Sequence, residues 1–83
     1  MPTDPPSARV LVRRREIGAQ IRAAMLRANL TQERLAERTG LSRDTIVRVE
    51  LGTTSARLDW LIAIADAVGQ PLAELVREEP DGR

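Results

Sequence analysis

The sequence predicts a compact all-α domain built from five helices. Apolar residues recur at spacings of three and four along most of the chain, which is the period of an amphipathic helix. Trp60 is the only aromatic residue among 83, so the core must be aliphatic, and aliphatic side chains suit helix-on-helix packing. A chain of this length forms one small domain, near the size at which association with a second copy helps stability.

The two ends of the chain frame this domain. Three prolines among the first six residues predict a disordered N-terminal arm over residues 1–8. The helical domain is expected to span residues 9–77. Residues 78–83 are expected to form a flexible C-terminal tail, because Pro80 stops the last helix.

The first helix has a clear body and an ambiguous start. Four apolar residues share one helical face in the body: Ile17, Ile21, Ala24 and Ala28. Asn29 is the predicted C-cap. Residues 9–13 read equally as a short strand or as an early helical turn capped by Ser7, and both alternatives stay open.

Residues 31–52 predict two short amphipathic helices separated by a tight bend. Five apolar residues give the two helices one common buried face: Leu35, Ala36, Leu41, Ile46 and Val49. Thr31 and Ser42 are expected N-caps, because each hydroxyl can accept a hydrogen bond from an N–H of the first turn. Gly40 lies at the bend, where we expect a positive φ. The small Ala36 lets the helices cross at close range, which is the geometry of a helix-turn-helix.

Two further helices are predicted after the polar loop at residues 53–56. The fourth is indicated by apolar residues at helical spacing, namely Leu58, Leu61, Ile62, Ala65 and Val68. Gly69 ends this helix, and a short fifth helix over residues 71–77 starts with Pro71 in its first turn, where the missing N–H has no partner to lose. Leu58, Leu61, Ala65 and Val68 are expected to form the buried stripe of this helix. Trp60 lies on the margin of that stripe, either as a lid over the core or as an exposed interface anchor.

Composition excludes most catalytic chemistry. The chain has no cysteine, histidine or lysine, so it offers no thiolate, imidazole or Schiff-base amine. We therefore expect a protein that is not an enzyme and that uses no metal and no cofactor. No apolar run approaches the ~18 residues of a membrane span, and the N-terminus lacks the apolar segment of a signal peptide. A cytoplasmic protein without a membrane partner is expected.

Charge is distributed unevenly along the chain. The net charge is +1, but residues 1–57 carry eleven arginines and six acids, whereas residues 58–83 carry two arginines and six acids. The first part is therefore +5 and the second −4. This asymmetry suits a protein that turns one face toward phosphates and the other away from them.

Residues 31–52 resemble the Cro and phage-repressor (XRE-like) helix-turn-helix family. The pattern is carried by Gln32, Leu35-Ala36, Gly40, Ile46 and Glu50-Leu51-Gly52, and it continues into residues 17–22 and 61–75. The resemblance implies a lambda-repressor-like fold and binding to double-stranded DNA. Two positions depart from the pattern. Met25 replaces an arginine that pairs with the glutamate at position 50, so Glu50 is left to pair with another arginine or to stay solvated, and Arg57 replaces the usual N-cap of the fourth helix.

The outward face of the second motif helix holds the predicted base-contacting residues. Because Ile46 and Val49 are expected to be buried, four side chains point away from the core: Arg43, Asp44, Val47 and Arg48. Arginine can donate two hydrogen bonds to guanine, a carboxylate can accept one from cytosine, and a valine methyl can touch thymine, so the predicted site contains G and C. The alternative for Asp44 and Arg48 is a surface ion pair at i,i+4 spacing.

Phosphate contacts are predicted from three segments around this helix. The first motif helix begins with polar residues that resemble the family's phosphate ligands, and the loop after the second helix follows the DNA backbone in that family. The residues predicted to contact phosphate are Thr31, Gln32, Thr45, Thr53, Thr54, Arg57 and Arg14. Arg14 belongs to a run of three arginines, residues 13–15, that is expected to form an arm reaching phosphate or the minor groove; the alternative is a solvated helix face.

These observations predict a sequence-specific transcription regulator that binds palindromic operator DNA as a homodimer, with residues 42–49 in the major groove. An antitoxin or other protein-interaction component that regulates its own operon, with a toxin as a possible partner, is the alternative, and a restriction-modification controller is a further small-regulator role. The predicted dimer interface comprises Trp60, Leu72, Leu75 and Val76. The alternatives are that the last three close the monomer core and that residues 10–12 form the interface.

Overall fold

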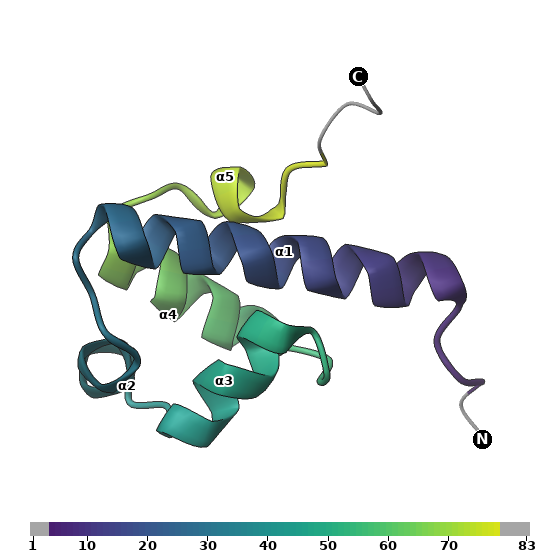
Figure 1. Cartoon of the computed structure of the whole chain (residues 1–83), viewed down its shortest axis with the longest axis horizontal. Coiled ribbons are helices and arrows are strands. Elements are labelled where there is room, and N and C mark those ends of the chain that lie inside the picture. The colour runs from purple at the N-terminus through teal and green to yellow at the C-terminus, as the bar shows by residue number, and fades with distance from the viewer. Residues whose placement is uncertain (1–3, 79–83) are drawn as a thin grey trace.

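A computed structural model of the chain describes residues 4–78 and contains five helices in that range, α1 (Ala8–Arg27), α2 (Gln32–Thr39), α3 (Arg43–Leu51), α4 (Leu58–Val68) and α5 (Leu72–Val76). Helix α1 runs across the molecule, with α5 on one side of it and α2 and α3 on the other (Figure 1). The predicted all-α architecture of five helices is confirmed.

The start of α1 settles the open question at residues 9–13 in favour of a helix. The Ser7 hydroxyl accepts a hydrogen bond from the Val10 N–H at 3.2 Å, and the Ser7 carbonyl accepts one from the Leu11 N–H. A capped first turn is therefore formed where a strand was the alternative. The predicted disordered arm, residues 1–8, overlaps this turn at Ser7 and Ala8, while residues 1–3 lie outside the described residues.

Several helix ends differ from the prediction by one residue. The C-cap of α1 is Ala28, and Asn29 follows it in the left-handed region at φ 56°. Pro71 is the N-cap of α5 and not part of its first turn, because its ψ of 146° is extended. The predicted tail, residues 78–83, lies outside the described residues except for Glu78.

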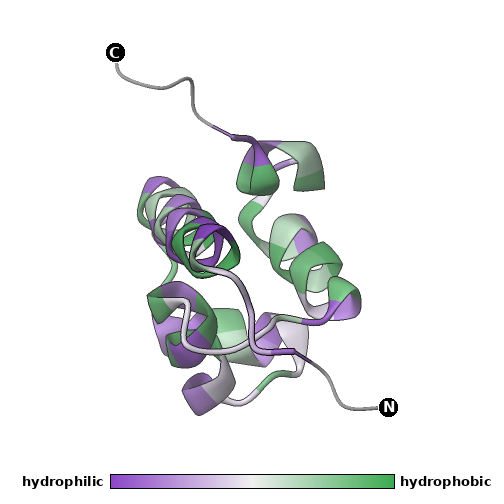
Figure 2. Ribbon diagram, turned by 90° about the vertical axis from the view of Figure 1, so that its right-hand side faces the viewer, coloured by the Kyte–Doolittle hydropathy of each residue, from purple (hydrophilic) through white to green (hydrophobic). Residues whose placement is uncertain are grey.

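The core draws one fully buried aliphatic side chain from each helix: Ile21, Leu35, Ile46, Ile64 and Leu75. Helix α4, which is hydrophobic along most of its length (Figure 2), buries Ala65 and Val68 as predicted. The prediction is wrong for Leu58, which is 62% exposed. Side chains of a helix lean toward its N-terminus, so the side chain of the first residue of α4 extends beyond the packed part of the molecule.

Helix α1 and the C-terminal end of α3 approach each other closely. A Cβ atom on the buried Gly18 would lie 2.6 Å from the carbonyl oxygen of Val49 and still closer to that of Glu50. A Cβ atom on Gly52 would lie 2.8 Å from the backbone nitrogen of Arg15. The backbone at the end of α3 therefore rests directly on α1, and only glycine fits at these two contacts.

Two structural features are absent from residues 4–78. None of the helices there combines the length and the apolarity that crossing a membrane requires. In the same range, no three acidic side chains gather in a way that could hold a metal ion.

Candidate nucleic-acid interface

Helices α2 and α3 form a capped pair joined by a left-handed glycine. The Thr31 hydroxyl accepts a hydrogen bond from the Arg34 N–H at 3.1 Å, and the Ser42 hydroxyl accepts one from the Thr45 N–H at 3.0 Å. Gly40 ends α2 at φ 77°, and no atom lies within 4 Å of where its Cβ would be. The glycine is thus required for backbone conformation and not for space. Both predicted caps and the predicted positive φ are confirmed.

Helix α3 has an inner face and an outer face. Ile46 and Val49 are buried on the inner face, as predicted. On the outer face the side chains of Arg43, Asp44 and Arg48 are 61 to 69% exposed. Val47 is half-buried between the two faces. The outward orientation predicted for Arg43, Asp44 and Arg48 is confirmed, whereas Val47, predicted to point outward with them, is half-buried. The outer face presents two cations and one anion to solvent.

The charged groups on the outer face are held only by other exposed groups. The Arg48 Nη2 atom lies 2.7 Å from the Asp44 carboxylate, which realises the i,i+4 pair. The Arg43 Nε atom lies 3.4 Å from the carboxylate of Glu33 on α2. Exposed ion pairs of this kind contribute ~0–1 kcal/mol each, so either arginine can exchange its carboxylate for a DNA acceptor at small cost. Sequence reasoning missed the Arg43–Glu33 pair, because spacing within one helix does not reveal a pair across the turn.

Glu50, at the C-terminal end of α3, is tied to the other two helices of this region. Its side chain is only 5% exposed, and its Oε1 atom lies 3.4 Å from Nη1 of Arg22 on α1. The same oxygen accepts a hydrogen bond from Nε2 of Gln32 at 3.2 Å. With Met25 in place of the family's arginine, the sequence left open whether Glu50 pairs with another arginine or stays solvated. It pairs with Arg22, which lies three residues before Met25 on α1. Within the described residues the Oε2 atom of Glu50 is buried without a hydrogen-bond partner.

The polar side chains of the loop after α3 differ in their exposure and in their contacts. The Arg57 guanidinium lies 5.8 Å from the ring centroid of Trp60, which is a cation–π distance. Thr53 is exposed and donates from its hydroxyl to the Arg48 carbonyl at 3.4 Å. Thr54 is half-buried. Arg57 and Thr53 are therefore exposed at the surface, Arg57 beside α4 and Thr53 at the end of α3.

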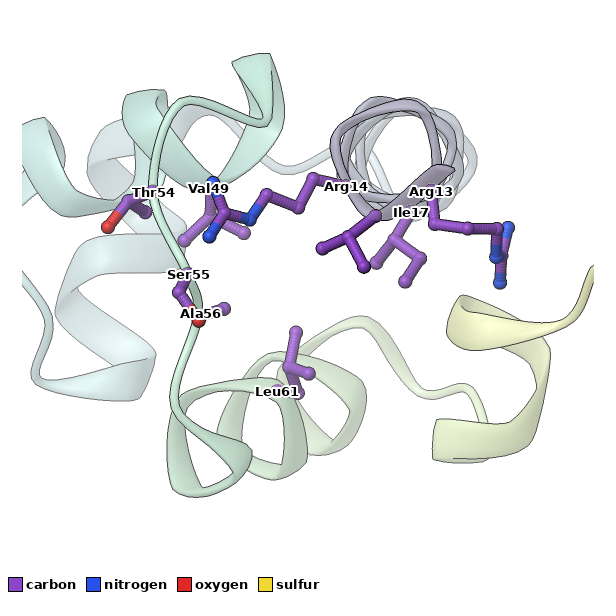
Figure 3. A pocket seen from close by; sticks show the side chains of 9 residues that line it. Arg13, Arg14, Ile17, Val49, Thr54, Ser55, Ala56 and Leu61 are labelled. Carbon is purple, nitrogen blue, oxygen red and sulfur yellow. The ribbon is translucent and has the colours of Figure 1, made fainter. Parts of the chain in front are cut away.

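The predicted arm at residues 13–15 is instead part of α1. Arg13 turns toward α5, lying 2.6 Å from the Glu16 carboxylate and donating to the Val76 carbonyl at 2.7 Å. Arg14 turns the other way and lines a pocket together with Thr54 (Figure 3). Because these residues are helical and point in different directions, they do not form an extended arm.

Of the remaining predicted phosphate contacts, Thr31 and Thr45 are occupied by capping interactions. The Thr31 hydroxyl caps α2, and Thr45 Oγ1 accepts a hydrogen bond from the Ser42 hydroxyl at 2.8 Å. Gln32 donates its amide to Glu50, as described above. These side chains therefore support the α2–α3 pair, and the free N–H groups in the first turn of α2 are the groups there that can still donate a hydrogen bond to an anion.

The predicted dimer interface is corrected for Leu75. This side chain is 1% exposed, because α5 packs against both α1 and α4, so it has no surface to offer to a partner. Leu72, Val76 and Trp60 are half-buried and pack against the same core. The alternative that this segment closes the monomer core therefore describes Leu75 better.

Comparisons with known proteins agree on the kind of domain. The helix-turn-helix domain family matches residues 16–77. The structure is similar to the restriction-modification controller protein C.AhdI from Aeromonas hydrophila, with a TM-score of 0.75, 28% identity and coverage of 77% of this chain and 97% of that chain. It is also similar to the hypothetical transcription factor NHTF from Neisseria, with a TM-score of 0.75, 25% identity and coverage of 96% and 88%.

The clp gene regulator ClgR from C. glutamicum shares the fold, with a TM-score of 0.72, 24% identity and coverage of 76% of this chain and 82% of that chain. No curated protein sequence matches this chain.

Proposed function

The chain belongs to the helix-turn-helix domain family, as the resemblance of residues 31–52 predicted, and from that premise we propose that it is a sequence-specific DNA-binding transcription regulator with no enzymatic role. In this proposal α3 enters the major groove with its N-terminal half toward the bases. Helix α2 lies across the DNA backbone, where the N–H groups of its first turn meet phosphate.

The observation that carries this proposal is the outer face of α3. Arg43 and Arg48 are exposed there, on a helix whose inner face is buried. A guanidinium at this position can donate two hydrogen bonds to O6 and N7 of guanine, and the Asp44 carboxylate can accept one from N4 of cytosine. The proposed operator therefore contains G and C at the positions that α3 reads.

Phosphate contacts are proposed to fix the register of α3 on the duplex. The start of α2 offers backbone N–H groups next to Thr31 and Gln32, and the loop after α3 offers Arg57 and Thr53. Such contacts hold a protein in position without reading sequence. Removing one of them should weaken specific and random DNA about equally.

We further propose that two copies bind one palindromic operator. A single short helix reads few base pairs, and a two-fold dimer doubles the site by placing two copies of α3 roughly one helical turn apart, ~10 base pairs centre to centre.

Selection of duplexes from a random library with the purified full chain, followed by footprinting of the enriched sequence, tests this function. The expected result is a palindrome whose half-sites contain guanine and are spaced by about one turn of DNA. Enrichment no better than that of random duplex would contradict a sequence-specific regulator.

Similarity to C.AhdI favours one narrower role, that of a restriction-modification controller. In this proposal the chain regulates its own gene. Footprinting on the DNA upstream of the chain's own gene distinguishes this role. Protection of a palindrome there supports a controller, and protection only at distant sites contradicts it.

A further inference from the structure

A pocket of about 240 Å³ lies between α1, the loop after α3 and α4 (Figure 3). Five aliphatic side chains form its apolar lining: Val10, Ile17, Val49, Ala56 and Leu61. An apolar cavity of ~150 Å³ is large enough to take up benzene, so this pocket has room for an apolar group of about six to eight carbons. Its size therefore suits the hydrocarbon part of a small molecule.

The Arg14 guanidinium adds an uncompensated positive charge to this apolar pocket. The Arg14 side chain is half-buried and extends from α1 toward the loop after α3 (Figure 3). Among residues 4–78 it has no hydrogen-bond or ion-pair partner, and no acidic residue of that range lines the pocket. A partly desolvated guanidinium with free N–H donors is stabilised by an anion that accepts from them. The charge of the pocket therefore selects an anion.

The second arginine in the lining, Arg13, is already paired. Its side chain is only 16% exposed, lies 2.6 Å from the Glu16 carboxylate and donates to the Val76 carbonyl at 2.7 Å. Within the described residues, the lining thus leaves one guanidinium for a ligand. One guanidinium matches one carboxylate, to which it can donate two parallel hydrogen bonds.

We propose that this pocket binds a small carboxylic acid with an apolar body, its carboxylate paired with Arg14 and its hydrocarbon part on the aliphatic lining. A mostly apolar pocket with a single group that fixes orientation is typical of a small-molecule site. The apolar lining disfavours a fully polar anion, and the charge of Arg14 disfavours an amine. The proposal does not depend on the proposed function, because the lining includes none of Arg43, Asp44 and Arg48.

Calorimetric titration of the full chain with octanoate, in the absence of DNA, tests the proposal. Saturable binding of one molecule per chain is expected, with a dissociation constant of about 1 mM or lower. Hexanoate and butanoate should bind about 2–4-fold more weakly for each methylene removed, because each methylene loses apolar contact. Octylammonium, which carries the opposite charge on the same chain, should not bind.

The variant Arg14→Ala tests whether the charge directs binding. Loss of hydrogen bonds between charged groups should weaken octanoate binding about 10–100-fold. Arg15→Ala is the matched control, since it removes the same charge from the next residue of α1, which does not line this pocket. It should leave the octanoate affinity unchanged. Circular dichroism checks that both variants remain helical.

Amide chemical shifts locate the bound octanoate. Val10, Ile17, Ala56 and Leu61 should shift on titration, whereas Leu26, at the other end of α1, should not. Absence of saturable octanoate binding, equal binding of octylammonium, or equal octanoate affinities of the wild type and Arg14→Ala would each overturn the proposal. If octanoate does not bind and Arg14→Ala weakens specific and random DNA equally, Arg14 is a phosphate contact instead.

Discussion

The two ends of α3 are built in opposite ways. At the C-terminal end, the backbone rests on Gly18 of α1, and the buried Glu50 carboxylate is joined to Arg22 and Gln32. At the N-terminal end, Arg43 and its neighbours are exposed and paired only with other exposed groups. The difference separates two tasks: one end fixes the direction of the helix, and the other keeps side chains available for a ligand. A binding element needs both a fixed backbone and uncommitted donors.

The largest expected effect is that of salt on DNA binding, which depends on the exposed end of α3, compared with its effect on stability, which depends on the anchored end. If the exposed cations neutralise ~6–10 phosphates per dimer, affinity for DNA should fall ~10³–10⁵-fold between 50 and 200 mM salt. The free energy of unfolding should change little over the same range, because the contact with Gly18 involves no charged groups and the Glu50 carboxylate is buried, where salt screens it poorly. Fluorescence anisotropy and denaturant titration measure the two responses. A nearly flat binding curve would argue against a DNA-binding face.

Gly18→Val breaks the anchored end directly. The added side chain meets the carbonyl oxygens of Val49 and Glu50, so the free energy of unfolding should fall by ~3 kcal/mol or more. The neighbouring Ala19 is exposed, and Ala19→Val should cost no more than ~0.7 kcal/mol through helix propensity. Urea denaturation followed by circular dichroism compares them. Equal losses would show that the contact between α1 and α3 is looser than described.

Arg22→Ala tests the polar contacts at the same end. It leaves the buried Glu50 carboxylate with Gln32 as its remaining partner, so stability should fall by ~1–3 kcal/mol. Adding Glu50→Gln removes the uncompensated charge and should recover most of that loss. The double-mutant cycle is therefore expected to show strong coupling. Simple additivity of the two single losses would mean that Arg22 and Glu50 do not interact in solution.

Asp44→Ala should have the smallest effect on the free energy of unfolding, a few tenths of a kcal/mol, because the side chains of both Asp44 and Arg48 are exposed. Its effect on DNA is more informative. A carboxylate that accepts from cytosine should, when removed, relax the selected sequence at one base pair per half-site. Repeating the duplex selection with this variant measures the change. An unaltered operator would assign Asp44 to the surface pair alone.

Features that depend on local sequence could be predicted well. The caps at Thr31 and Ser42, the left-handed Gly40 and the outward face of α3 follow from residue type and helical spacing, and the structure has them where they were expected. The predicted C-cap of α1, Asn29, differs from the observed one, Ala28, by one residue. The reason is again local, since either residue can end a helix.

Features that depend on how helices rotate against one another could not be predicted. The Arg22–Glu50 pair joins residues far apart in sequence, and no spacing rule links them. The exposure of Leu58 and the burial of Leu75 follow from the positions of α4 and α5 relative to α1. Arg13 and Arg14 are adjacent in sequence, yet Arg13 is held at the end of α5 and Arg14 extends toward the loop after α3 (Figure 3). The base and phosphate contacts remain predictions, because they need DNA to be tested.

The central claim is that the outer face of α3 reads bases, and Arg43→Ala tests it most directly. The measurement is the affinity for the selected operator and for random duplex. Arg77→Ala is the control, at the C-cap of α5, and α5 lies on the other side of α1 from α2 and α3 (Figure 1). The account predicts that Arg43→Ala weakens operator binding by ~1–3 kcal/mol, with a much smaller loss on random duplex, while the control changes neither. An equal loss on both kinds of DNA would contradict the claim.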